Sequence, residues 1–322
     1  MEMQQTHPVI EFEQIVLRGC GLDVHEKNVV ATIDGEGLTK ETRTFDTFTS
    51  SLNELKQWLL NNSIRHVAME STGVYWKPVF NILEDSVNVI LVNARHLKSV
   101  PGRKTDKIDS QWICKLLLSG LLKNSYIPEE KIRQLRDLSR YSTKLTQQLA
   151  AEKNRIQKIL EDANIKLSSV VSDTSGVVAT KLIDGLIAAK NDLTELINNS
   201  YHKKLKASKE GLLKALTGRV TEHHKFMLRQ IKKHMAFLEE EIKVIDGQME
   251  ELLKEDQETI SLLSTVPGVD KKAATKIVAE TGIKMDAFAT EKHLAKWAGI
   301  CPGNNESGGK KKAQEPPTAT NI

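Results

Sequence analysis

Residues 15–34 read I-V-L-R-G-C-G-L-D-V-H-E-K-N-V-V-A-T-I-D, and this stretch decides the fold of the first part of the chain. Its apolar residues fall into two short runs, 15–24 and 28–34, each with the composition of a strand. The sequence D-G-E-G at 34–37 supplies turn-forming residues before a third run at 41–46. The pattern therefore predicts three strands joined by tight turns.

Strands and helices alternate in the next part of the chain, up to about residue 118. Ser50 or Ser51 is expected to cap the first of these helices. The resulting order, βββαβαβα, is typical of an RNase H-like (RuvC-like) α/β domain, which we assign to residues 1–125. The elements expected after the three strands are a helix at 52–61, a strand at 65–70, a helix at 75–84, a strand at 87–92 and helices to residue 118.

Residues 126–257 have the composition of long, charged helices. In the clearest of them, 225–254, apolar residues follow the alternating spacing of three and four that forms the a/d seam of a coiled coil. An earlier helix carries a similar seam, broken at Ser142 and Glu152. Such helices can pair with each other, pair with a second subunit, or form a bundle that only separates domains. The seam residues are Leu228, Ile231, Met235, Leu238, Ile242, Ile245, Met249 and Leu252, and in the earlier helix Leu135, Leu138, Leu145, Leu149, Ile156 and Ile159.

The other segments are less regular. Residues 258–312 are expected to form a small α-helical domain, and the polar, proline-containing tail 313–322 is expected to be disordered. Within 166–218, glycines are expected to interrupt the helices, at Gly176, Gly185 and Gly211.

Composition excludes several classes of protein. The 322 residues carry a net charge of +4, which is compatible with a nucleic-acid partner without requiring one. The three cysteines, Cys20, Cys114 and Cys301, are far apart and form no C-x-x-C pair, so neither a zinc site nor a disulfide framework is expected. The sequence contains no signal peptide and no apolar run of membrane-spanning length, so we expect a cytoplasmic protein with no membrane partner.

Four acidic residues are placed where an RNase H-like sheet would bring them together. Asp23 ends the first strand, Glu70 ends the fourth, and Asp106 and Asp109 lie on one face of the following helix. Carboxylates from three separate elements can surround two divalent ions about 4 Å apart, as phosphodiester displacement requires. Taken singly, Asp23 could instead cap a turn, and Asp106 and Asp109 could form a solvated first helical turn.

Three blocks of sequence carry a family resemblance across residues 17–120. The blocks G-L-D-V-H-E-K, M-E-S-T-G-V-Y-W and V-N-A-R-H-L-K-S-V-P-G-R-K-T-D-K-I-D resemble the DEDD-type insertion-sequence transposases of the IS110 family. The resemblance implies that Asp23, Glu70, Asp106 and Asp109 form a metal-binding acidic tetrad for Mg²⁺, with two ions. Nearby basic residues are expected to neutralise backbone phosphates, or else form a solvated loop. They are Arg95, His96, Lys98, Arg103, Lys104 and Lys107.

Residues 262–282 are expected to form a helix-hairpin-helix. Pro267, Gly268 and Val269 make the turn, and the second helix begins near Asp270. Backbone N–H groups at that helix start suit a phosphate, so the predicted nucleic-acid-binding residues include Gly268, Lys271 and Lys272. A hairpin with only a structural role is the alternative. The residues of the second helix expected to pack inward are Ala273, Ala274 and Ile277.

The resemblance continues over residues 258–312, through a W-A-G-I-C-P block to a serine in an E-S-G context, Ser307. It implies that Ser307 is a nucleophile that forms a phosphoserine link to a DNA end. From the residues alone, Ser307 is a loop serine beside three lysines, with no identifiable base. The chain ends 15 residues later without the further helices of the family pattern, so we expect a truncated copy whose activity is in question.

Three functions remain open at this point. The first is a transposase or recombinase that acts on DNA through the acidic tetrad and Ser307 in the bacterial cytosol or nucleoid. The family resemblance implies a structured guide RNA, and the a/d seam favours a homo-oligomer, either a dimer or a tetramer. The second is a nuclease like a Holliday-junction resolvase, without a covalent serine. The third is an inactive remnant that binds nucleic acid.

Overall fold

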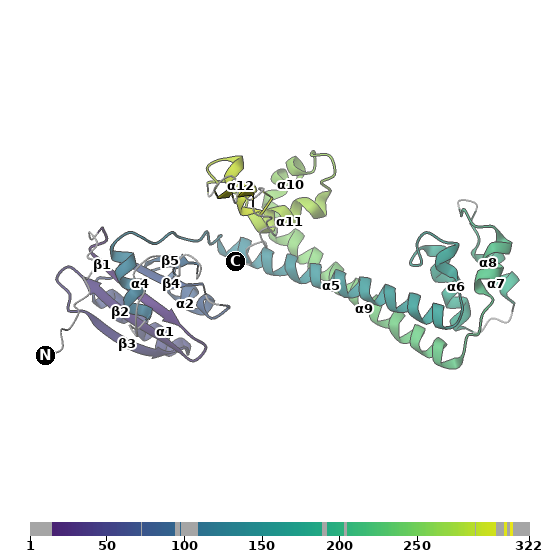
Figure 1. Ribbon diagram of the computed structural model, residues 1–322, viewed down its shortest axis with the longest axis horizontal. Coiled ribbons are helices and arrows are strands. Elements are labelled where there is room, and N and C mark those ends of the chain that lie inside the picture. Colours follow the sequence, from purple (N-terminus) through teal and green to yellow (C-terminus); the bar gives the residue numbers. More distant parts are fainter. Residues whose placement is uncertain are drawn as a thin grey trace. The chain divides into compact units, whose positions relative to one another are not determined.

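The computed structural model describes residues 15–71, 73–93, 97, 109–188, 192–202, 205–286, 288–300, 306–307 and 310–311. The chain divides into two compact units (Figure 1). One consists of Met1–Ile127 with Asp286–Ile322, and the other of Pro128–Met285. No helix in the described ranges has the length and apolar character needed to cross a membrane.

The first unit contains a mixed five-stranded sheet, in the order β3-β2-β1-β4-β5. The first three strands are antiparallel neighbours, whereas β1 pairs with β4, and β4 with β5, in parallel. The five predicted strands are confirmed, and so is the adjacency of the first and the fourth. The strands are β1 (Arg18–Val24), β2 (Asn28–Gly35), β3 (Glu41–Asp46), β4 (His66–Glu70) and β5 (Asn88–Val92).

Helices cover both faces of this sheet. The helices α1 (Thr49–Asn61) and α2 (Trp76–Leu83) bury Leu55 and Leu83 in a core with residues of all five strands. The helix α4 (Asp109–Leu118) forms a second, smaller core on the opposite face, with Ala68 of β4 and Val92 of β5. The result is a three-layered α/β unit with α4 alone on one face among the described helices.

The predicted serine cap of α1 is wrong. The N-cap residue is Phe48, which has an extended backbone and makes no side-chain capping hydrogen bond. Both serines lie inside the first turn of the helix, so neither can cap it. The hydroxyl of Ser51 instead accepts a hydrogen bond from the backbone N–H of Asp46 at 3.1 Å, and this bond joins the helix to the end of β3.

Two long helices, α5 (Glu130–Asp162) and α9 (Glu222–Leu252), form the centre of the second unit. Their predicted apolar seams are buried against each other, so the helices pair within one chain. The helices run antiparallel, because contacts join the end of each to the start of the other. His224 Nε2 lies 2.8 Å from Asp162 Oδ2. The seam spacing therefore no longer supports a second subunit.

The two residues that interrupt the α5 seam make polar contacts with α9. Ser142 is buried, and its hydroxyl donates to Asp246 at 3.1 Å. Glu152 is also buried, and its Oε1 lies 3.1 Å from His234 Nδ1. A buried polar group is costly unless it is hydrogen-bonded, so these contacts favour one register of the two helices over shifted ones.

Shorter helices pack at one end of this pair: η1 (Leu167–Ser169), α6 (Val177–Ile187), α7 (Leu193–Ser200) and α8 (Lys209–Leu216). Of the three predicted glycine breaks, only Gly176 marks a boundary, as the N-cap of α6. Gly185 lies inside α6, where a Cβ would sit 2.3 Å from the side chain of Leu196. Gly211 lies in the first turn of α8 and donates its N–H to Ser208 Oγ at 3.0 Å.

The helices η2 (Lys254–Asp256), α10 (Gln257–Leu263) and α11 (Lys271–Thr281) follow α9. Asp270 caps α11 by accepting from the N–H of Ala273 at 2.7 Å, which agrees with the predicted helix start. The prediction that Ile277 packs inward is wrong. Ile277 is exposed, and α11 turns Ala274, Val278 and Ala279 into the core that it shares with α5. The remaining elements are α12 (Glu291–Trp297), β6 (Glu306–Ser307) and β7 (Lys310–Lys311).

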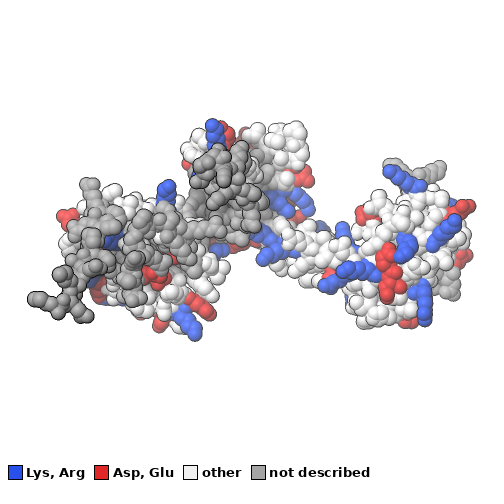
Figure 2. All heavy atoms as spheres, viewed as in Figure 1, with Lys and Arg blue, Asp and Glu red and all other residues white. Residues whose placement is uncertain are grey.

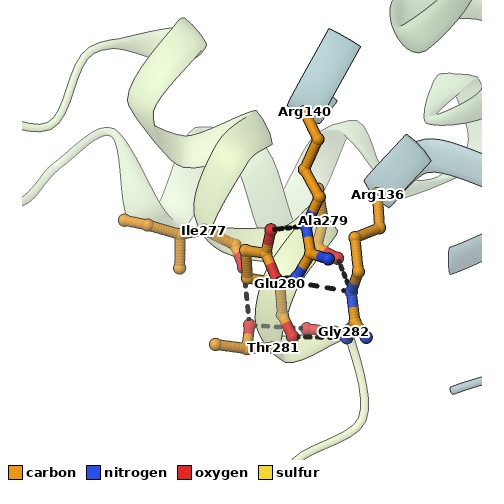
Figure 3. Close-up of polar contacts among 7 residues, drawn as sticks. All are labelled: Arg136, Arg140, Ile277, Ala279, Glu280, Thr281 and Gly282. Carbon is orange, nitrogen blue, oxygen red and sulfur yellow. Dashed lines mark hydrogen bonds and ion pairs between the residues drawn. The ribbon is translucent and has the colours of Figure 1, made fainter. Parts of the chain in front are cut away.

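Two arginines of α5 hold the carboxyl end of α11 (Figure 3). Arg136 is buried and donates to the backbone carbonyls of Ala279 at 3.1 Å and Glu280 at 2.7 Å. These carbonyls belong to the last turn of α11, where they have no partner within the helix. Arg136 therefore acts as a C-terminal cap contributed by another helix.

Candidate metal site and nucleic-acid-binding residues

Three of the four predicted acidic residues lie in the described part of the chain, at one end of the sheet. Asp23 lies one residue before the end of β1, and Glu70 is the last residue of β4. The parallel register of these strands places Asp23 and Glu70 side by side at the carboxyl ends. Asp109 is the first residue of α4. Asp106 lies outside the described residues.

Asp23 and Glu70 also share a face of the sheet. Side chains alternate between the two faces along a strand, so Asp23 lies on the face of Gly21 and Glu70 on the face of Ala68. Ala68 packs in the core formed by α4, and Gly21 is in contact with the backbone of α4. Both carboxylates therefore belong to the face that α4 covers.

The absence of a side chain at Gly21 lets α4 lie directly on β1. A Cβ at this position would lie 2.2 Å from the carbonyl oxygen of Ser110 and 2.3 Å from the backbone nitrogen of Cys114. The other end of α4 is hydrogen-bonded to the residues that precede β1, so the helix runs antiparallel to the strand. Asp109, at its start, is thereby brought to the strand end that carries Asp23.

A pair of buried hydroxyl groups joins the first turn of α4 to the sheet. Ser110 Oγ lies 2.8 Å from Thr32 Oγ1 on β2, and Thr32 Oγ1 lies 2.9 Å from Thr42 Oγ1 on β3. The sequence analysis did not identify these residues. The available signals were a threonine within an apolar strand and a serine directly after Asp109, and neither is specific by itself.

The described carboxylates have the donor chemistry of a Mg²⁺ site, because Mg²⁺ prefers hard oxygen ligands. Asp23 Oδ2 lies 3.1 Å from His25 Nε2, so an exposed imidazole stands beside this carboxylate. Within the described residues, no group of three or more His, Cys, Asp or Glu side chains lies close enough to hold a metal ion. The strand ends and the start of α4 thus converge, while the described side chains do not by themselves form a complete ligand set.

The two cysteines in the described part of the chain are unsuited to metal binding or nucleophilic chemistry. Cys20 and Cys114 are free and fully buried. Burial raises the pKa of the Cys114 thiol to about 12, and it raises the pKa of Cys20 well above its usual value. Because the thiolate is the reactive and metal-binding form, both side chains act as small core residues at neutral pH.

The predicted phosphate site at the start of α11 is partly occupied by contacts within the chain. Gly268 has a φ of +86°, and a Cβ there would meet nothing within 4 Å, so the hairpin backbone is open to a ligand. The two lysines are paired with carboxylates of α9: Lys271 with Glu250 at 3.1 Å, and Lys272 with Asp246 at 2.7 Å. The hydrogen bond that Lys272 donates to the carboxylate of Asp246 raises the pKa of Lys272. Both lysines remain exposed at the surface.

Charges of both signs are interspersed over the unit of residues 128–285 in the view of Figure 2. The predicted basic residues of the third sequence block lie outside the described residues. They are Arg95, His96, Lys98, Arg103, Lys104 and Lys107. For Ser307 only the backbone is described, as part of β6, where it pairs with Lys310 of β7.

Two family models match the chain and together cover more than half of it. A model described as a transposase of the DEDD and IS110 type matches residues 20–165. A second, described as the transposase IS116/IS110/IS902 family, matches residues 260–320. A search of curated proteins found no significant match. The DEDD family is one that depends on divalent metal ions and acts on DNA. The chain belongs to the IS110 family of insertion-sequence transposases, enzymes of the DNA transposase and recombinase class.

Proposed function

We propose that the chain is a Mg²⁺-dependent transposase whose RNase H-like domain, residues 1–125, cuts DNA through Asp23, Glu70, Asp106 and Asp109. One observation carries the proposal. The carboxyl ends of β1 and β4 and the first turn of α4 meet on one face and at one end of the sheet, and all three bear a carboxylate of the tetrad.

The chemistry of the donors fits this role. Mg²⁺ bound between these carboxylates would stabilise negative charge on the attacking and leaving oxygens of a phosphodiester. The role of the chain is to hold the carboxylates in a fixed arrangement. Asp23 and Glu70 are placed by the backbone of a sheet, and Asp109 by a helix that touches that sheet backbone to backbone. Rigid elements position a catalytic group more precisely than loops do.

The proposal also includes the C-terminal part of the chain. Ser307 is the proposed nucleophile that attacks a DNA phosphorus and releases the neighbouring strand end. Residues 258–312, with the helix-hairpin-helix and Gly268, are the proposed contact with DNA. The long helices of 126–257 form the proposed intervening region, with a coiled-coil character supported by the paired seams of α5 and α9. A guide RNA and a homo-oligomeric assembly are proposed on the family membership alone.

The test is strand cleavage of plasmid DNA that carries the ends of the element, with Mg²⁺ and with a chelator. Asp23→Asn and Glu70→Gln are expected to lower cleavage by at least a hundredfold, because each removes a ligand charge and preserves the size of the side chain. Asp34→Asn is the matched control. Asp34 is the penultimate residue of β2, at the opposite end of the sheet, where it pairs with Lys40 at 3.4 Å. Cleavage by Asp23→Asn and Glu70→Gln at the rate of the parent chain would contradict the proposal.

A further inference from the structure

We propose that Thr32 and Ser110 are positioning residues, whose hydrogen bond fixes the first turn of α4 and thereby the Asp109 carboxylate at the metal site. The inference rests on the proposed function, because it concerns the same site. Neither hydroxyl group is a metal ligand, but the hydrogen bond between them contributes to metal affinity.

The two hydroxyls are fully enclosed. Both Thr32 and Ser110 have an exposed fraction of 0%, and their oxygens are 2.8 Å apart. Thr32 Oγ1 also lies 2.9 Å from Thr42 Oγ1, so Ser110→Ala leaves Thr32 its contact with Thr42, whereas Thr32→Val removes the contact of Ser110 with the sheet. The contact is therefore directional as well as attractive, unlike the apolar packing around it.

The position of the hydrogen bond links it to the carboxylates. Thr32 is the register partner of Gly21 on the neighbouring strand, and Gly21 is the point at which α4 touches β1. Ser110 directly follows Asp109 in the same helical turn. A rotation or slide of α4 at this point would move Asp109 relative to Asp23.

Past its first turn, α4 contacts the sheet mainly through apolar side chains, together with a hydrogen bond from Cys114 Sγ to the carbonyl of Gly19 at 3.4 Å. Ile113, Leu116 and Leu117 pack in an apolar core, whose contacts are non-directional. Ser119, just past the far end of the helix, bonds to the carbonyl of Lys115 within its own turn at 3.0 Å. In the described residues, the side-chain hydroxyl bond between α4 and the sheet thus occurs at the end that carries Asp109. A bond needed only for stability could lie anywhere along the helix.

The test measures Mn²⁺ binding to the full-length chain by the EPR signal of the free ion, together with cleavage. Thr32→Val and Ser110→Ala each remove one hydroxyl at nearly constant volume. Thr32→Ser retains the hydroxyl and should restore parent behaviour. Ser119→Ala is the control for loss of a largely buried serine hydroxyl from the same region. The double variant Thr32→Val with Ser110→Ala removes both partners of this bond, which costs less than the loss of one. Thr42, which then loses Thr32, still accepts from Gln111 Nε2 at 3.5 Å.

We expect Thr32→Val, Ser110→Ala and the double variant to weaken Mn²⁺ binding by about tenfold or more, as is typical when a residue that orients a metal ligand is lost. The double variant should be no worse than Thr32→Val, since both lack the bonds that Thr32 makes to Ser110 and Thr42. If the double variant binds Mn²⁺ as tightly as the parent chain while Asp23→Asn binds it more weakly, this inference is overturned and the proposed function stands. If Asp23→Asn also binds Mn²⁺ like the parent chain, the proposed function fails, and this inference falls with it.

Discussion

Arg140 holds the carboxylate of Glu280 through two hydrogen bonds, Nε to Oε1 and Nη2 to Oε2, each 2.9 Å long (Figure 3). The hydrogen bond with Glu280 raises the pKa of Arg140. One helical turn away, Arg136 binds the backbone carbonyls at the end of the same helix. The two arginines make different contributions, because Arg140 is far more exposed than Arg136.

Replacing Arg136 should loosen α11 more than replacing Arg140. Arg136→Met leaves the carbonyls of Ala279 and Glu280 without their partner, at a cost of about 1–3 kcal/mol. Arg140→Met removes an ion pair at the surface and should cost about 0–1 kcal/mol. Hydrogen exchange of the amides of α11 measures both, because it reports the free energy of local opening.

Lys144→Met is the matched control for these two variants. Lys144 is an exposed cation of the same helix, and its replacement should change the opening free energy by less than about 0.5 kcal/mol. If Arg140→Met lowers the free energy of opening of α11 more than Arg136→Met does, Arg136 is not the C-terminal cap of this helix.

A methyl group at Gly21 should disrupt the first unit and its activity together. In Gly21→Ala the new Cβ would meet the backbone of Ser110 at 2.2 Å, and a backbone atom cannot rotate away as the end of a side chain can. Overpacking of this kind costs about 1–3 kcal/mol, and the shift of α4 should abolish cleavage. Thermal unfolding and plasmid cleavage test the two effects.

Gly247→Ala is the control for Gly21→Ala. Gly247 lies within α9, and a Cβ there would meet nothing within 4 Å. Alanine is the better helix former, so this variant should be more stable by about 0.5–1 kcal/mol. If both variants lose stability, the close contact at Gly21 is not the cause of the loss in Gly21→Ala.

The Cys114 thiol should make the first unit sensitive to alkali. Burial raises its pKa in the folded state to about 12, from an ordinary value of 9.0. Such a group stabilises the fold fully below pH 9, and its contribution is lost as the pH rises from 9 toward 12, because the unfolded chain then releases a proton that the folded chain retains.

The free energy of unfolding should therefore fall by up to about 1.4 kcal/mol per pH unit for this thiol in that window. Urea titrations followed by tryptophan fluorescence between pH 9 and 11 measure this slope. In Cys114→Ala the slope should be shallower by the contribution of about one proton. An equal slope in the parent chain and in Cys114→Ala would show that the thiol ionises as readily in the folded state.

The order of the sheet could be predicted from the sequence because it depends on local signals. Strands such as β2 carry β-branched runs bounded by turn residues, and the alternation of strands and helices after β3 favours a parallel β1–β4 pair. The placement of Asp23 and Glu70 side by side follows from this order. Register within a strand is similarly constrained, since a slip by one residue would turn its apolar side chains to the other face.

Features that depend on a distant partner could not be predicted in this way. An a/d seam has the same spacing whether its partner is in the same chain or in another, so the sequence left the pairing of α5 with α9 open. Gly185 has the composition of a helix break, but it lies inside α6 because Leu196 fills the space of its missing side chain. The Thr32–Ser110 bond joins residues 78 positions apart, and neither end has a distinctive motif.

The nucleophile can be separated from the metal site by trapping the product. If Ser307 attacks the DNA, a protein–DNA adduct that survives denaturation should form with the parent chain and disappear in Ser307→Ala and in Asp23→Asn. Ser264→Ala is the control and should retain the adduct. Among the contacts described, the Ser264 hydroxyl bonds only to the carbonyl of Ile260 in its own helical turn, at 2.8 Å. Metal-dependent cleavage that persists in Ser307→Ala, without an adduct in any variant, would favour a resolvase-like mechanism with water as the nucleophile over a serine recombinase.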